Sequence, residues 1–179
     1  DGSAAAVGNR EAAVAAGLLC LQAGEVGTAR ATLEHSATAL GADAPSLAAA
    51  LALVRTADGD DEGARKAALA VDEAATATFA DRVLALIAMG LLEAGAGDTG
   101  ASRAALGRAR QLADTTDDRL TQVLVRMAEA RAAERLGEPA DIGEARAGLA
   151  ELGLIDMGWD TAYRLAAAGA GAARQPTAT

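Results

Sequence analysis

The stretch LALIAMGLLEAGAGDTGASRAALGRARQLA, residues 84–113, decides the expected fold. Its first part is apolar at almost every position, its middle holds closely spaced glycines, and its last part mixes alanine with arginine. Alanine is the best helix former, and glycine commonly follows the last turn of a helix. The stretch therefore predicts two helices joined by a short turn.

The turn chemistry of this stretch recurs along the chain. A glycine followed by an acidic residue occurs at Gly24-Glu25, Gly59-Asp60, Gly97-Asp98 and Gly137-Glu138, with the glycines 35 to 40 residues apart. This spacing is typical of proteins built from repeated two-helix units. We expect helical hairpins at about residues 10–40, 45–77, 79–113 and 117–152.

The expected fold class is all-α, an α-solenoid of about four antiparallel helix hairpins with a C-terminal capping helix. The capping helix is expected at residues 158–168 and carries Trp159 and Tyr163. The domain then spans residues 10–168. Residues 1–9 are expected to be disordered or a linker, and residues 169–179 a disordered tail. The chain begins without a methionine, so we interpret it as a piece of a longer protein.

Composition supports a helical array and excludes some partners. The chain has 179 residues and is 51% hydrophobic but only 2% aromatic, so small side chains carry the core. A net charge of −9 argues against nucleic acid, because phosphate contacts need a basic face. No uninterrupted apolar run reaches the roughly 18 residues of a membrane span. The single cysteine, Cys20, fits a reduced cytoplasmic setting.

Two glycine-rich segments resemble ligand loops but are better explained as turns. Residues 95–100 spell GxGxxG, yet a dinucleotide site needs a strand before this motif and a helix is expected here. Residues 58–63, DGDDEG, begin like a calcium loop, but the twelfth position is Leu69 instead of a bidentate glutamate. Weak cation binding is the alternative for the second segment. We predict no cofactor and no metal.

The sequence contains no recognisable set of catalytic residues. His35 is the only histidine, and its neighbours Glu34 and Ser36 lie on other helical faces. Cys20 has no adjacent basic residue to lower its thiol pKa, so packing is the simpler role. We predict no catalytic residue and no enzyme activity, although an enzyme stays the third hypothesis.

Small residues recur at fixed places around the turns. They lie on the first helices at Gly17, Ala52, Gly90 and Ala130, and early on the second helices at Ala29, Ala64 and Ser102. The positions four residues later hold Leu33, Ala68 and Leu106, and in the fourth unit the match shifts to Ala145 and Leu149. In this pattern, residues 10–152 resemble tetratricopeptide repeats. The family's aromatic positions hold Cys20, Arg55 and Glu93 instead. The repeats are similar to those that follow the ATPase or cyclase module of large bacterial signalling and transcription regulators.

The resemblance implies a groove lined by the first helix of each hairpin. The corresponding residues predicted to bind a partner are Leu18, Leu21, Leu53, Ile87, Leu91, Met127, Arg131 and Glu134, together with Val14 and Ala49. Such a mostly apolar groove suits a hydrophobic helix or segment of another protein, or of another domain of the same parent chain. The basic and asparagine residues that clamp a free C-terminus in some family members have no counterpart in the first three repeats.

The leading hypothesis is a non-catalytic interaction or regulatory module of a larger cytoplasmic signalling or transcription-regulatory protein. The alternative is a sensor that holds a small molecule between Met89, Leu91, Met127 and Arg131. An open groove favours the first hypothesis and a closed cavity favours the second. An apolar patch shared between copies of the chain would instead indicate a homodimer.

Overall fold

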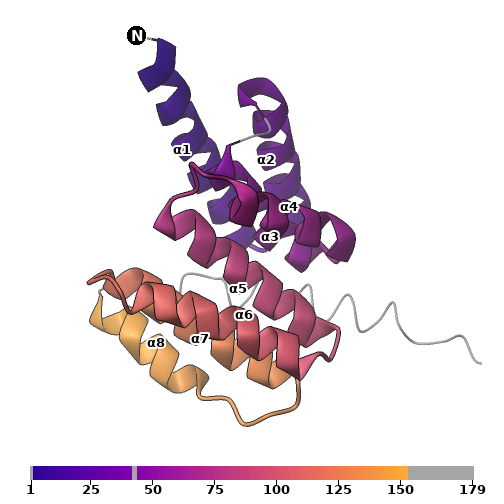
Figure 1. Cartoon of the computed structure of the whole chain (residues 1–179), viewed down its shortest axis with the longest axis vertical. Helices are drawn as coiled ribbons and strands as arrows, with labels where there is room; N and C mark the ends of the chain where they lie inside the picture. The colour runs from indigo at the N-terminus through magenta and orange to yellow at the C-terminus, as the bar shows by residue number, and fades with distance from the viewer. Residues whose placement is uncertain (1, 42–43, 153–179) are drawn as a thin grey trace, which may run out of the picture.

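A computed structural model describes residues 2–41 and 44–152 (Figure 1). Within these ranges the chain forms eight α-helices, which are α1 (Gly2–Gln22), α2 (Val26–Leu40), α3 (Pro45–Asp58), α4 (Asp61–Glu73), α5 (Phe79–Gly95), α6 (Thr99–Ala113), α7 (Arg119–Arg135) and α8 (Ile142–Glu151). Consecutive helices pack in pairs, and the pairs follow one another along the long axis of the molecule. An all-α array of helical hairpins is therefore confirmed for this part of the chain.

The first helices of the pairs form the centre of the array. α3 packs against α1 and α5, and α5 packs against α7. Each second helix also contacts the first helix of the next pair, as α2 does with α3 and α4 with α5. The main core therefore runs from α1 to α7, and a smaller cluster of Val123, Met127, Ala145 and Leu149 lies between α7 and α8.

Some boundaries differ from the expectation and others lie outside the described residues. α1 begins at Gly2, well before the predicted hairpin start near Arg10, because the alanines that follow Ser3 favour a helix. The predicted capping helix at 158–168 and the tail at 169–179 are outside the described ranges. None of the helices in those ranges is long and apolar enough to cross a membrane.

All four hairpin turns have the same backbone geometry. The turn glycines have positive φ angles, 79° at Gly24, 80° at Gly59, 81° at Gly97 and 71° at Gly137. The next residue donates its amide to the carbonyl five residues earlier, with N···O distances of 2.9, 3.0, 2.9 and 2.8 Å for Glu25–Cys20, Asp60–Arg55, Asp98–Glu93 and Glu138–Ala133. This bond is typical of the Schellman motif, and it requires a left-handed residue that glycine adopts without strain.

Acidic residues of three turns cap the following helices, whereas Glu25 at the start of α2 makes no side-chain capping bond. Asp60 accepts a hydrogen bond from the Gly63 amide, and Asp98 accepts one from the Ala101 amide, both at 2.9 Å. In the longer fourth turn this role passes to Asp141, which accepts from the Glu144 amide at 3.0 Å. The GxGxxG and DGDDEG segments therefore form turns, as interpreted from the sequence, and each also caps the helix that follows.

Two glycines set how closely the paired helices approach. A Cβ atom placed on Gly17 would lie 2.6 Å from Leu33 Cγ, and one placed on Gly90 would lie 2.7 Å from Leu106 Cδ2. Both leucines are buried, so neither can move away into solvent. The second hairpin has buried alanines, Ala52 and Ala68, at the matching positions. In the second hairpin the first helix therefore has the larger Ala52 instead of glycine, and the second helix has the smaller Ala68 instead of leucine.

We expect Gly90→Ala to destabilise the protein. Overpacking against Leu106 costs about 1–3 kcal/mol and exceeds the gain of up to about 1 kcal/mol in helix propensity. The matched control is Gly107→Ala in α6, where a Cβ meets no heavy atom within 4 Å and the propensity gain should raise stability. Urea unfolding followed by circular dichroism measures both. Equal stability changes for the two variants would contradict the close packing at Gly90.

Arginines link each hairpin to the next. The linking residues Arg30, Arg65 and Arg103 follow the early small residue of the second helix, and Arg146 has the same position in the fourth unit. Arg30 pairs with Asp58 at 2.7 Å and Asp60 at 3.1 Å, Arg65 pairs with Glu93, and Arg103 pairs with Glu138 at 2.8 Å. These links were not predicted, although an arginine occupies this position in every unit.

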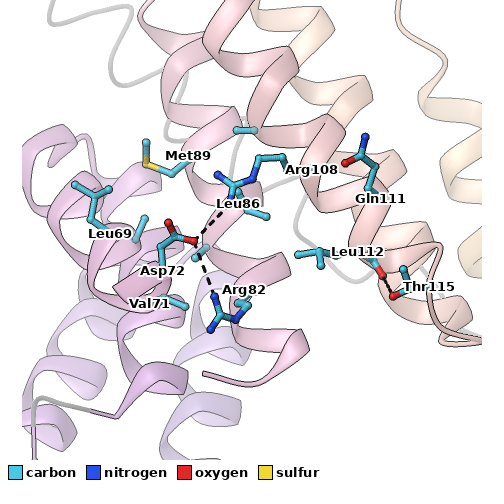
Figure 2. Close-up of a pocket in the computed structure, with 13 residues that line it drawn as sticks. Leu69, Val71, Asp72, Arg82, Leu86, Met89, Arg108, Gln111, Leu112 and Thr115 are labelled. Carbon is cyan, nitrogen blue, oxygen red and sulfur yellow. Dashed lines mark hydrogen bonds and ion pairs between the residues drawn. The ribbon is translucent and has the colours of Figure 1, made fainter. Parts of the chain in front are cut away.

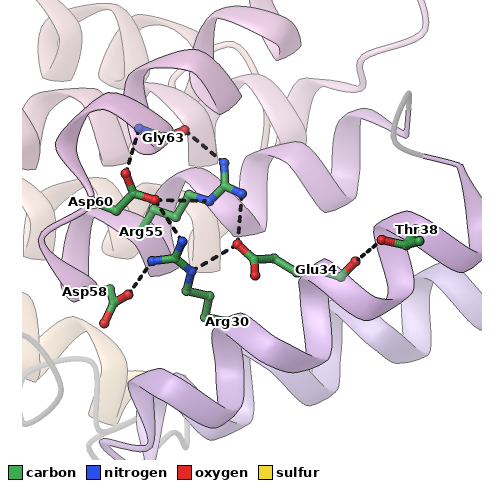
Figure 3. A network of polar contacts seen from close by, with 7 residues as sticks. All are labelled: Arg30, Glu34, Thr38, Arg55, Asp58, Asp60 and Gly63. Atoms are coloured by element: carbon green, nitrogen blue, oxygen red, sulfur yellow. Dashed lines mark hydrogen bonds and ion pairs between the residues drawn. The ribbon is translucent and has the colours of Figure 1, made fainter.

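The first of these links belongs to a wider network (Figure 3). Glu34 on α2 accepts hydrogen bonds from Arg55 on α3 at 2.9 Å and from Arg30 at 3.0 Å. Arg55 also donates to the Gly63 carbonyl at 3.2 Å. The hydrogen bond from Arg55, followed by that from Arg30, lowers the pKa of Glu34 below its ordinary value. The network joins α2, α3 and the start of α4.

The lowered pKa makes the contribution of Glu34 depend on pH. Because the folded state favours the ionised carboxylate, its stabilisation is present above the unfolded pKa of about 4.5 and is lost as the pH falls through the lower folded pKa. Since Glu34 is partly exposed, we expect Glu34→Gln to lower the unfolding free energy by no more than about 1 kcal/mol at pH 7.

Urea unfolding from pH 7 to pH 3.5 compares this variant with the wild-type chain. The difference in stability should shrink below about pH 4.5. Glu11→Gln, at an exposed position on α1, is the control that should change little at either pH. If Glu34→Gln still lowers the unfolding free energy by the same amount near pH 3.5, this result would contradict the role of the ionised carboxylate in the network.

Candidate functional site

Most residues of the groove predicted from the resemblance lie in the interior. The structure buries Leu21, Leu53, Ile87, Leu91, Met127 and Arg131. Leu18 is half-buried against the same core, and Glu134 is exposed and pairs with Arg131. The physical reason is that first helices are covered by neighbours on several sides, so the apolar faces assigned to a groove are used in packing between hairpins.

The residues of the predicted small-molecule site are not gathered in one cavity. Leu91 belongs to the main core, whereas Met127 packs with Val123, Ala145 and Leu149 near the end of the described array. Met89 is half-buried and faces a different space, between α4 and α6. A sensor site at these four positions would need a rearrangement of the core.

A surface groove of about 440 Å³ lies between α4, α5 and α6 (Figure 2). α4 and α6 both pack on α5, which forms the floor between them. The apolar lining comes mainly from Leu69 and Val71 of α4, Leu86 and Met89 of α5, and Leu112 of α6. Leu69 is 52% exposed, an unusual position for a large apolar side chain in this molecule. The groove thus combines an apolar floor with an accessible edge.

Three charged residues meet across this groove. The Asp72 carboxylate on α4 lies 3.5 Å from Arg108 Nη2 on α6 and 4.0 Å from Arg82 Nη1 on α5. In Figure 2 Asp72 points between the two guanidinium groups. Arg82 also donates to the Ala74 carbonyl at 3.2 Å. Strong charge-assisted hydrogen bonds are about 2.7–2.9 Å long, so both ion pairs are loose.

The groove predicted from the resemblance lies on the first helices, and the α4–α5–α6 groove was not predicted. The apolar stripe of α4, read from Ala64, Ala67, Ala68 and Val71, faces the core as expected, and all four residues are buried. Leu69 lies off this stripe, on a face that is otherwise polar. The signal that the sequence offered for this groove was a leucine beside a regular apolar stripe. The sequence could not show that α6 would provide the opposite wall of the groove.

Other titratable groups are explained by local packing. Burial raises the pKa of Glu129 on α7, and the ion pair with Arg110 on α6 opposes that shift. Hydrogen bonds from the Thr121 side chain and amide lower the pKa of Asp118, which caps α7. His35 is exposed and Cys20 is half-buried. No group of three or more metal-ligating side chains occurs among residues 2–41 and 44–152.

Comparison with protein-family models, curated proteins and solved structures gives no significant match to the chain. Within the described residues, the α4–α5–α6 groove presents apolar and charged side chains together at the surface.

Proposed function

We propose that the chain is a non-catalytic interaction module, a tetratricopeptide-like α-solenoid that binds an apolar helical segment of a partner in the α4–α5–α6 groove. The observation that carries the proposal is this groove, with its apolar floor and with Leu69 exposed at its edge. Single exposed leucines are ordinary on protein surfaces. Leu69 differs because it borders further apolar side chains, Leu86 and Met89, that a partner can cover together with it.

The shape of the groove favours a helix as its occupant. Two helices, α4 and α6, border it over a third helix, α5, so an added helix would continue the packing that already holds the array together. Amphipathic helices bind such grooves through apolar side chains spaced three or four residues apart. The groove lies at the surface and its edge residues are exposed, which supports a partner segment over an enclosed small molecule.

The repeat resemblance supports a place in a larger signalling or transcription-regulatory protein. Arrays of helical hairpins provide extended surfaces for partners, because each hairpin contacts only its neighbours and leaves its remaining faces exposed. The single cysteine supports a cytoplasmic setting. The partner is then a segment of another protein or of another domain of the same parent chain.

A synthetic amphipathic helix tests the docking surface. The probe carries two leucines four residues apart and a polar face of glutamine, and it is titrated into the ¹⁵N-labelled 179-residue chain. We expect chemical-shift changes at Leu69, Leu86, Met89 and Leu112. Leu69→Gln should weaken binding by about tenfold, because a leucine anchor contributes about 1.5–3 kcal/mol when buried.

Leu19→Gln is the matched control, since Leu19 on α1 is 63% exposed and lies away from the groove. This variant should bind the probe like the wild-type chain. Absence of binding, or equal weakening by the two substitutions, would contradict the groove as a docking surface.

A further inference from the structure

We propose that the groove selects a partner helix with an acidic side chain one turn away from its apolar anchors, and that this carboxylate binds between Arg82 and Arg108. The inference rests on the proposed function, because it names the chemistry of the helix that the groove receives. It concerns a side-chain carboxylate within the helix and needs no free C-terminus.

The charge of the groove favours an acidic partner. Two arginines and one aspartate line it, and its remaining lining residues are uncharged, so the lining carries one positive charge in excess. The whole chain has a net charge of −9. A positive apolar groove on an acidic protein is electrostatically distinct from its surroundings and complements an acidic apolar helix.

The arginines of the groove retain hydrogen-bonding capacity. Arg30, at the first hairpin interface, makes contacts of 2.7 to 3.1 Å with three carboxylates. Arg108, by contrast, contacts Asp72 at 3.5 Å, and its side chain is 62% exposed. A guanidinium has five N–H donors in a planar fork that fits a carboxylate. Arg108 can therefore donate hydrogen bonds to a second carboxylate without losing a short hydrogen bond of its own.

Arg108 does not belong to the series of arginines that recurs at the hairpin interfaces. When the hairpins are aligned on their turn glycines, Arg103 matches Arg30 and Arg65, the arginines that link neighbouring hairpins. In the same alignment Arg108 matches His35 and Ala70. Arg108 is thus particular to the groove between the second and third hairpins, whereas the linking arginines recur.

The groove also suggests the spacing within the partner. Leu69 and Asp72 are three residues apart on α4, so they lie one turn apart on the same side of that helix. The apolar part of the groove is therefore adjacent to its ionic part along the axis of α4. A helix that lies along α4 would place its acidic residue three or four positions from its leucine anchor.

In the free protein, the Asp72 carboxylate occupies the position where the carboxylate of the partner would bind. It projects from α4 between the two guanidinium groups (Figure 2). A bound carboxylate would share or replace these contacts, and the two negative charges would repel each other. Removal of the Asp72 charge should therefore strengthen the binding of an acidic helix.

Two probe peptides test the inference on the 179-residue chain. One is the leucine helix with the glutamine face described above. The other is the same peptide with glutamate instead of glutamine at the positions one helical turn before and one helical turn after the leucines. We expect the glutamate peptide to bind about three to ten times more tightly at low salt, and this preference to decrease as ionic strength rises.

Variants assign the preference to residues. Arg108→Gln should remove it, and Arg82→Gln should reduce it. Arg103→Gln should leave it unchanged, because Arg103 is a 69% exposed arginine on the same helix that pairs with Glu138 outside the groove. Asp72→Asn should increase it. Circular dichroism melts check that each variant is folded.

The outcomes separate the two proposals. Equal affinity of the wild-type chain for both peptides would overturn the acidic preference and leave the docking surface intact. Absence of binding by either peptide would overturn the docking surface as well. A preference that survives Arg108→Gln, or that Asp72→Asn abolishes, would show that the carboxylate binds elsewhere.

Discussion

The close contact between Gly90 on α5 and Leu106 on α6 is the constraint on which the third hairpin depends. A Cβ atom at Gly90 would overlap the leucine side chain, so the two helices can approach this closely only with glycine at that position. The buried Ser102 hydroxyl donates to the Gly90 carbonyl at 2.8 Å and reinforces the same contact. Since α5 is the floor of the groove and α6 is one wall, this contact also determines the position of α6 relative to α5 in the groove.

The opposite wall is held by a different kind of interaction. α4 packs on α5, and the ion pair between Arg65 and the buried Glu93 joins the two helices. The groove is therefore a consequence of how the hairpins stack: α4 and α6 both use α5 as a support, and the space between them stays open to a partner. A binding surface arises here without any loop built for the purpose.

Tight and loose ion pairs have different roles in this molecule. The network around Glu34 consists of contacts of 2.7 to 3.2 Å that connect α2, α3 and the start of α4. The contacts of Asp72 with Arg82 and Arg108 are long and exposed, so they contribute little to stability. Exposed charges that stability does not require are available for recognition, which is the basis of the proposed acidic partner.

Features that depend on local chemistry could be predicted from the sequence. The turn glycines and the repeated hairpins belong to this group, because a left-handed glycine ends a helix within a few residues of the chain. Which apolar faces are covered depends on how the hairpins stack. The repeat resemblance assigned Ile87 and Leu91 to a groove, and the stacked hairpins bury both. The meeting of Asp72, Arg82 and Arg108 could not be predicted either, because the contact of side chains on three helices depends on how those helices pack.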